Sequence, residues 1–95
     1  MKKIGVLFTV IILAVLFAVS ASAATEGYYT YKVENGEATI TDVDESISGD
    51  VVIPSTLGGY PVTSIGYEAF EFCENLRSIT IPEGVTYIGS YAFAH

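Results

Sequence analysis

The sequence predicts a mainly β protein in which an N-terminal β-hairpin leads into a short solenoid, with a signal-peptide helix in front. Three observations predict this architecture. The turn dipeptide Asn35-Gly36 separates two runs of β-forming residues. A block of nine residues returns 23 residues later with six positions unchanged, and a period of this size is typical of solenoid proteins. At the start of the chain, an uncharged apolar run follows two lysines.

The N-terminal segment has the three parts of a secretory signal peptide. Lys2 and Lys3 supply positive charge, residues 4–19 form an apolar run of 16 residues, and Ala21-Ser22-Ala23 is a small-x-small cleavage site. We therefore predict a signal peptide over residues 1–23, cleaved after Ala23, and a protein that is secreted or displayed on a bacterial cell surface. The alternative is that residues 4–24 stay in the bilayer as an anchor, with the lysines on the cytoplasmic side.

The excess of acidic over basic side chains limits the classes of partner that the protein could bind. Beyond the predicted cleavage site the chain has two basic side chains, Lys32 and Arg77, against all 11 acidic ones, so its formal charge there is −9, compared with −7 for the whole sequence. Binding to nucleic acid or to anionic membranes draws on Lys and Arg. Neither is an expected partner, and a membrane is involved only if the signal segment is retained. Proteins and neutral glycans remain open as partners.

Residues 28–34 and 37–42 are predicted to form a hairpin around Asn35-Gly36. This dipeptide accepts the positive φ angles of a type I′ turn, and a two-residue loop fixes the register of both strands. The predicted cross-strand pairs are Tyr31 with Ile40, Lys32 with Thr39, Val33 with Ala38 and Glu34 with Glu37. We assign residues 24–48 to this hairpin and to the acidic connector after it.

The connector, residues 42–50, is rich in carboxylates, which are ligands that Ca²⁺ prefers. Its spacing does not match the D-x-D-x-D-G calcium loop, and an acidic loop is usually only solvated. We therefore favour a solvated loop over a calcium site.

Residues 49–95 form the predicted repeat segment. Residues 62–70 return as residues 85–93, and upstream of each copy an apolar strand ends in Ile-Pro, with extra residues around Gly58-Gly59 in the first copy that belong in a loop. Alternation points Ile79 and Ile81 inward and Thr80 outward, and Pro82 ends the strand because it cannot donate a ladder hydrogen bond.

The repeated positions also predict how successive coils pack. Ile65, Val85 and Ile88 are expected to face inward from the return path. Gly66 and Gly89 suit corners where a side chain would clash or where φ is positive. Short helical or 3₁₀ turns are expected at Ala69-Phe70 and Ala92-Phe93, whose phenylalanines stack from one coil to the next.

At these positions the sequence resembles the bacterial leucine-rich repeats of BspA-like surface proteins. Residues 76–93 follow the family pattern L-x-x-I-x-I-P-x-x-V-x-x-I-G-x-x-A-F, and Cys73 stands at the cysteine position that closes the first copy. The resemblance implies an extracellular or surface-displayed array used for adhesion and protein binding, without catalytic residues or a cofactor. Fewer than two full repeats are present and no cap is visible, which predicts the front of a longer array or a chain that completes its core by pairing with another.

Few residues could carry catalysis or bind a metal. The chain has one histidine, His95, and one cysteine, Cys73. Nucleophilic catalysis needs a nucleophile and a base held together, and a zinc site needs three or four protein ligands. We therefore predict no enzyme activity, no metal site and no cofactor, with an exported enzyme as the least favoured class. Cys73 lies between Phe72 and Glu74 and is expected to be a buried structural thiol rather than a reactive one.

The surface expected to bind a partner is the outward face of the repeat strands. Strand alternation places Val52 there on the first coil, and Arg77, Ser78 and Thr80 on the second. The predicted function is that of a secreted or surface leucine-rich repeat protein that mediates adhesion or protein binding. The alternative is a structural spacer in a larger extracellular protein whose activity lies in other domains.

The signal peptide yields a direct prediction. When a bacterial host exports the chain, we expect Edman sequencing and intact-mass spectrometry of the exported product to show that it begins at Ala24. Recovery of the uncleaved chain in the membrane fraction, with its lysines still present, would instead support the retained anchor.

Overall fold

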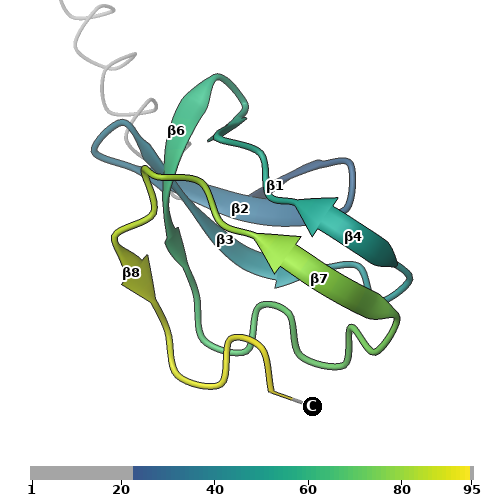
Figure 1. Ribbon diagram of the computed structural model, residues 1–95. Helices are drawn as coiled ribbons and strands as arrows, with labels where there is room; N and C mark the ends of the chain where they lie inside the picture. Colours follow the sequence, from purple (N-terminus) through teal and green to yellow (C-terminus); the bar gives the residue numbers. More distant parts are fainter. Residues whose placement is uncertain (1–22, 95) are drawn as a thin grey trace, which may run out of the picture.

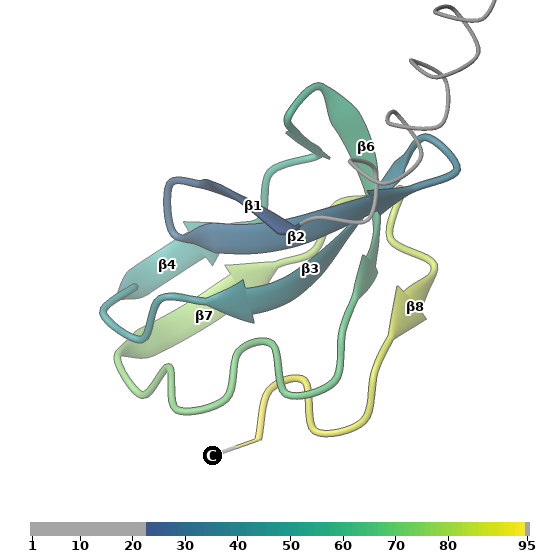
Figure 2. The same ribbon diagram turned by 180° about the vertical axis from the view of Figure 1, so that it is seen from behind.

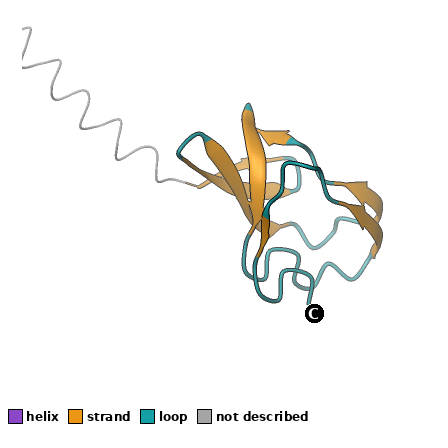
Figure 3. Ribbon diagram, turned by 60° about the vertical axis from the view of Figure 1, so that its left-hand side comes forward, coloured by secondary structure: helices purple, strands orange, loops and turns teal. Residues whose placement is uncertain are grey.

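The computed structural model describes residues 23–94, and within them every regular element is a β-strand (Figure 1). The strands are β1 (Ala23–Glu26), β2 (Tyr29–Glu34), β3 (Glu37–Val43), β4 (Gly49–Val52), β5 (Thr56–Leu57), β6 (Tyr60–Ile65), β7 (Leu76–Thr80) and β8 (Tyr87–Ile88). Loops and turns join them into a curled, open-ended coil (Figure 3). The mainly β class is confirmed, while residues 1–22 of the predicted signal peptide lie outside the described part.

The predicted hairpin forms between β2 and β3 in the predicted register. Tyr31 pairs with Ile40, Val33 with Ala38, and Glu34 with Glu37. The turn residues Asn35 and Gly36 have φ angles of 54° and 76°, the left-handed conformation that a type I′ turn requires. A bulge between Thr30 and Tyr31 shifts the far end of the pair.

One strand was not expected from the sequence. β1 pairs antiparallel with β2 and turns the hairpin into a three-stranded meander. Its four residues, Ala23-Ala24-Thr25-Glu26, are all exposed. They show no alternation of apolar and polar residues, which is the pattern that predicts a strand. Ala23, the predicted last residue of the signal peptide, is the first residue of this strand.

The repeat segment forms two parallel ladders, as a solenoid requires. In the first ladder β3 pairs with β6 and β6 with β8, which aligns Ile40, Ile65 and Ile88. In the second, β4 pairs with β7 and aligns Val51 with Ile79. Figures 1 and 2 show β4 and β7 side by side, with the β2–β3 hairpin and β6 on the other side of the coil. The insertion around Gly58-Gly59 forms a tight hairpin between β5 and β6.

The apolar side chains of the coils meet in one core, as predicted. Ile40, Ile53, Leu57, Val62, Ile65 and Phe70 are almost completely buried. Ile79, Ile81 and Val85 are half-buried and pack against this core. The rings of Phe70 and Phe93 stack with their centroids 4.9 Å apart.

Ile88 corrects the prediction of inward positions. It aligns with the buried Ile65, yet 45% of its surface is exposed. The reason is that β8 is the outermost strand of its ladder in the described part of the chain. Ile88 therefore occupies an inward position without a covering layer.

The return paths turn sharply but form no helix within residues 23–94. Hydrogen bonds three residues apart, such as Ala69 N–H to Gly66 O and Ala92 N–H to Gly89 O, close single turns at the two expected places. Glu68, Phe72 and Tyr91 have φ angles of 57°, 66° and 57°. A residue in the left-handed region cannot continue a right-handed helix, so each 3₁₀-like turn ends after one bond.

The glycine corners arise from close backbone contact, not from positive φ. A Cβ at Gly89 would lie 2.7 Å from Tyr67 N and 2.9 Å from Gly66 C, on the preceding coil. A Cβ at Gly66 would lie 3.0 Å from Ile40 O. The Gly89 N–H donates to Ile65 O at 2.7 Å, and the Gly66 N–H donates to Ile40 O at 2.8 Å. Glycine at these positions lets each coil lie directly against the one before it.

This geometry predicts the effect of adding one methyl group. Gly89→Ala forces two backbones apart, and overpacking of this kind typically costs about 1–3 kcal/mol. Gly84→Ala is a matched control, because its Cβ would meet only Val62 O, at 3.4 Å. We expect urea unfolding followed by circular dichroism to show a lower free energy of unfolding for Gly89→Ala and little change for Gly84→Ala. Equal stability of the two variants would contradict the close contact.

Candidate binding face

The structure brings the four predicted binding residues together on the β4–β7 ladder. Val52 lies on β4, opposite Thr80 of β7. Arg77 and Ser78 precede Thr80 on the same strand, and all four side chains are exposed, with 70% of Val52 open to solvent. We call the surface formed by Asp50, Val52, Arg77, Ser78 and Thr80 the ladder face.

Asp50 is the member of the ladder face that sequence analysis missed. Its carboxylate accepts two hydrogen bonds from Arg77, from Nε at 3.2 Å and from Nη2 at 3.3 Å, and one from Ser78 Oγ at 3.0 Å. The strand alternation that identified Val52 also places Asp50 outward, two residues earlier. The signal was therefore present, but the sequence analysis assigned Asp50 to the acidic connector of residues 42–50.

The two partners of Asp50 set its electrostatics. The Arg77 guanidinium, and then the Ser78 hydroxyl, hold the pKa of the Asp50 carboxyl below its ordinary value. Both side chains of the ion pair are largely in water, where such pairs contribute little to stability. The two parallel bonds do fix the plane of the guanidinium. The ladder face thus presents the oriented guanidinium of Arg77, the hydroxyl groups of Ser78 and Thr80, and the two methyl groups of Val52.

The acidic connector adopts a local turn. The backbone N–H and the hydroxyl of Ser46 both donate to Asp44 Oδ1, at 2.9 and 2.8 Å. These bonds, the backbone one first, lower the pKa of Asp44. Across residues 23–94, no three His, Cys, Asp or Glu side chains converge as metal ligands would.

Cys73 is buried and unpaired in the described part of the chain. Its Sγ lies 3.9 Å from the carbonyl oxygen of Asp44. Burial raises the pKa of the Cys73 thiol above its ordinary value, and the carboxylates of Glu45, Asp42 and Asp44 raise it further. The thiolate, which is the reactive form, is therefore disfavoured. His95 lies outside the described residues.

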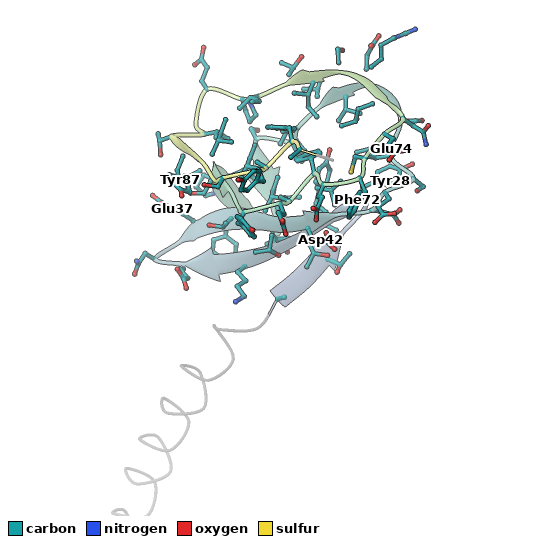
Figure 4. The ribbon with its side chains drawn as sticks, turned by 90° about the horizontal axis from the view of Figure 1, so that it is seen from below. Tyr28, Glu37, Asp42, Phe72, Glu74 and Tyr87 are labelled. Atoms are coloured by element: carbon teal, nitrogen blue, oxygen red, sulfur yellow. The ribbon has the colours of Figure 1, made fainter. Side chains whose placement is uncertain are left out.

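Exposed aromatic side chains were also not singled out by the sequence. Tyr67 and Tyr91 lie on successive return paths with their rings edge to face, 6.0 Å apart. In Figure 4, Tyr28, Phe72 and Glu74 lie toward one end of the molecule, whereas Tyr87 and Glu37 lie toward the other. Aromatic residues are common both in strands and in hydrophobic cores, so residue type alone does not tell whether each of these side chains is buried or exposed.

The comparisons with known proteins agree with this geometry. Residues 49–95 match the family model described as a BspA type leucine-rich repeat region. A leucine-rich repeat protein of known structure from Bacteroides capillosus is 31% identical, and the match covers 77% of this chain and 75% of that one with a TM-score of 0.55. The chain belongs to the BspA-type leucine-rich repeat family.

Two further structures extend the comparison of this repeat protein. A leucine-rich cell surface protein from Faecalibacterium prausnitzii is 37% identical over 76% of the chain, with a TM-score of 0.66. The leucine-rich repeat protein of T. pallidum is 26% identical over 77% of the chain, also with a TM-score of 0.66. The matches cover 20% and 35% of those two proteins. Among curated proteins, no significant match to the chain is found.

In residues 23–94 of this repeat protein, no helix has the length and hydrophobicity needed to cross a bilayer.

The environment of Cys73 predicts slow chemistry at its thiol. At neutral pH we expect a maleimide reagent to label Cys73 at least about tenfold more slowly in the folded chain than in urea, because the thiolate is disfavoured and shielded. Mass spectrometry over time measures both rates. Equally fast labelling in the two states would show that the thiol is open to solvent.

The raised pKa of Cys73 also gives a signed pH effect. The folded state holds the thiol proton more tightly than the unfolded state. The resulting stabilisation is complete below the unfolded-state pKa and is lost as pH rises through the folded-state pKa. The difference in urea midpoint between the wild type and Cys73→Ala should therefore shrink between neutral and alkaline pH, and a constant difference would contradict this.

Proposed function

We propose that this protein is an exported or surface-displayed binding module, and that its ladder face contacts a protein or a neutral glycan in adhesion. The observation that carries the proposal is the ladder face itself. Across the two strands Asp50 pairs with Ser78 and Val52 with Thr80, and the bonds to Asp50 hold Arg77 and Ser78 in place. A surface that is ordered before binding loses less entropy when a partner docks.

The composition of the ladder face supports the class of partner. Arg77 is a planar donor whose guanidinium can stack on an aromatic ring or donate to a carbonyl group. Ser78 and Thr80 add hydroxyl groups that donate and accept, and Val52 adds an exposed apolar contact. This mixture suits a polypeptide surface or a neutral sugar. The excess of acidic side chains in the exported part disfavours polyanions.

The proposal includes no catalysis. An acyl or group transfer would need an activated nucleophile beside a base, and the environment of Cys73 keeps its thiol protonated. The ladder face carries one carboxylate, Asp50, already bound to Arg77 and Ser78. The groups on the ladder face are suited to binding a partner.

A second candidate rests on the length of a relative. The chain spans about a fifth of the Faecalibacterium prausnitzii cell surface protein that it resembles. This supports the alternative in which the repeats act as a structural spacer in a larger extracellular protein. Sequencing the genomic DNA around this coding region separates the two, since additional repeats favour adhesion and a following catalytic domain favours the spacer.

The ladder face gives a direct test of binding. The probes are arrays of extracellular proteins and of neutral glycans, presented to the purified exported chain. We expect the double variant Ser78→Arg, Thr80→Arg to bind its array partner about tenfold more weakly, a loss of about 1.4 kcal/mol, because bulky charge covers the face. Surface plasmon resonance measures the change.

A charge-matched control keeps this test specific. Thr25 and Tyr28 are exposed and lie outside the ladder face, so Thr25→Arg, Tyr28→Arg adds the same charge elsewhere. We expect this variant to bind like the wild type. Equal losses in both double variants, or no loss in either, would exclude the ladder face, and a chain that binds nothing on either array would count against a binding function.

A further inference from the structure

The return paths carry a surface that combines tyrosine rings with carboxylates, and we call it the tyrosine face. It is formed by Glu45 of the connector together with Tyr67, Glu68, Glu71 and Tyr91. Tyr67 and Tyr91 are 61% and 66% exposed, and their rings lie edge to face with centroids 6.0 Å apart. The two return paths lie side by side at the bottom of Figure 2, so the tyrosine face spans successive coils.

The outward position of these side chains is a property of the coil itself. Tyr67 and Glu68 lie on the inner return path, which the second coil already covers, since the Glu68 N–H donates to Ser90 O at 3.2 Å. Tyr67 stays largely exposed beneath that coil. Glu68 and Tyr91 occupy equivalent positions 23 residues apart, and both have a φ angle of 57°. Successive repeats therefore present this position on the same side of the coil.

The carboxylates of the tyrosine face are close together and lack a basic partner within residues 23–94. Partial burial raises the pKa of Glu71, and the negative charges of Glu68 and Glu45 raise it further. The charge of Glu68 also raises the pKa of the Tyr67 phenol. The one ion pair among the described residues lies on the ladder face. The tyrosine face is thus a site of unneutralised negative charge, which favours a cation.

A guanidinium group suits both components of this surface. Its plane stacks on a tyrosine ring, and its parallel N–H groups donate to a carboxylate. Two rings and three carboxylates spread over two return paths offer more than one such position, so a segment with several arginines gains over a single free cation. The acidic excess of the exported part also attracts a basic partner at longer range.

We propose that the tyrosine face binds an arginine-containing basic segment of another protein, with guanidinium groups against the rings of Tyr67 and Tyr91 and in ion pairs with Glu68 and Glu71. The ladder face lies on β4 and β7 and presents the guanidinium of Arg77. The two surfaces therefore suit different partners, and the binding proposed for one does not depend on the other.

Binding of synthetic peptides to the purified exported chain tests the proposal by surface plasmon resonance. The probes are a peptide of alternating arginine and glycine and a lysine–glycine peptide of the same length. We expect the arginine peptide to bind more tightly, with an affinity that falls as salt is raised. The double variant Tyr67→Leu, Tyr91→Leu keeps the charge but removes both rings, and it should bind about tenfold more weakly. Tyr60→Leu, on the β5–β6 hairpin, is the control and should bind like the wild type.

A second pair of variants tests the carboxylates. Glu68→Gln, Glu71→Gln keeps both rings and is expected to weaken binding of the arginine peptide about fivefold, because two exposed ion pairs are lost. Glu34→Gln, Glu83→Gln removes the same charge from exposed positions on the β2–β3 hairpin and on the turn between β7 and β8. This control should bind nearly as tightly as the wild type.

Each other outcome would overturn the proposal. A wild-type chain that does not bind the arginine peptide at low salt would show that the surface takes no basic segment. Equal losses in the two glutamine variants would show attraction to net charge alone. Equal affinity for the arginine and lysine peptides, or unchanged binding without the two rings, would exclude guanidinium stacking. If circular dichroism shows that the double leucine variant is unfolded, Tyr67→Leu alone replaces it, because one exposed substitution removes less packing.

Discussion

The fold depends on direct backbone contact between successive coils at Gly66 and Gly89. A side chain at Gly89 would meet the backbone of the preceding coil below 3.0 Å, so the spacing of the coils is set by the absence of a Cβ. That spacing brings Ile65 into register with Ile88 and stacks Phe70 on Phe93. The core, the ladders and the exposed faces all depend on this spacing. A wider gap between the coils would break both the parallel hydrogen bonds and the stacking of Phe70 on Phe93.

Much of this architecture could be predicted from the sequence, since it rests on local rules. Asn35-Gly36 fixes the register of the β2–β3 hairpin. The 23-residue repeat places Phe93 on Phe70. Strand alternation accounts for the outward positions of Val52, Ser78 and Thr80, whereas Arg77, next to Ser78, is exposed at a register shift of the ladder. The structure groups all four predicted residues on one ladder.

The differences from the prediction have physical causes that are not local. β1 pairs through its backbone and buries no side chain, so no residue pattern marks it. Ile88 occupies the repeat position of the buried Ile65, but the burial of a side chain also depends on the strand that covers it, and Ile88 is 45% exposed. The short turns expected at Ala69-Phe70 and Ala92-Phe93 do form, each closed by one hydrogen bond. Within residues 23–94 they do not extend into a helix, since Glu68, Phe72 and Tyr91 adopt positive φ. Asp50 was missed because it was assigned to the acidic connector, and its contacts with Arg77 and Ser78, 27 and 28 residues away, show only in the structure.

The antiparallel meander has a consequence for how the chain folds. Its strands are adjacent in sequence, and the β2–β3 turn joins residues only a few positions apart. The parallel ladders instead join residues 23 or more positions apart. Contacts between residues far apart in sequence form more slowly, because closing the long loop between them costs conformational entropy before the contact gains any free energy. Synthesis from the N-terminus delivers the meander first, so β3 is available as a template edge when β6, and later β8, emerge.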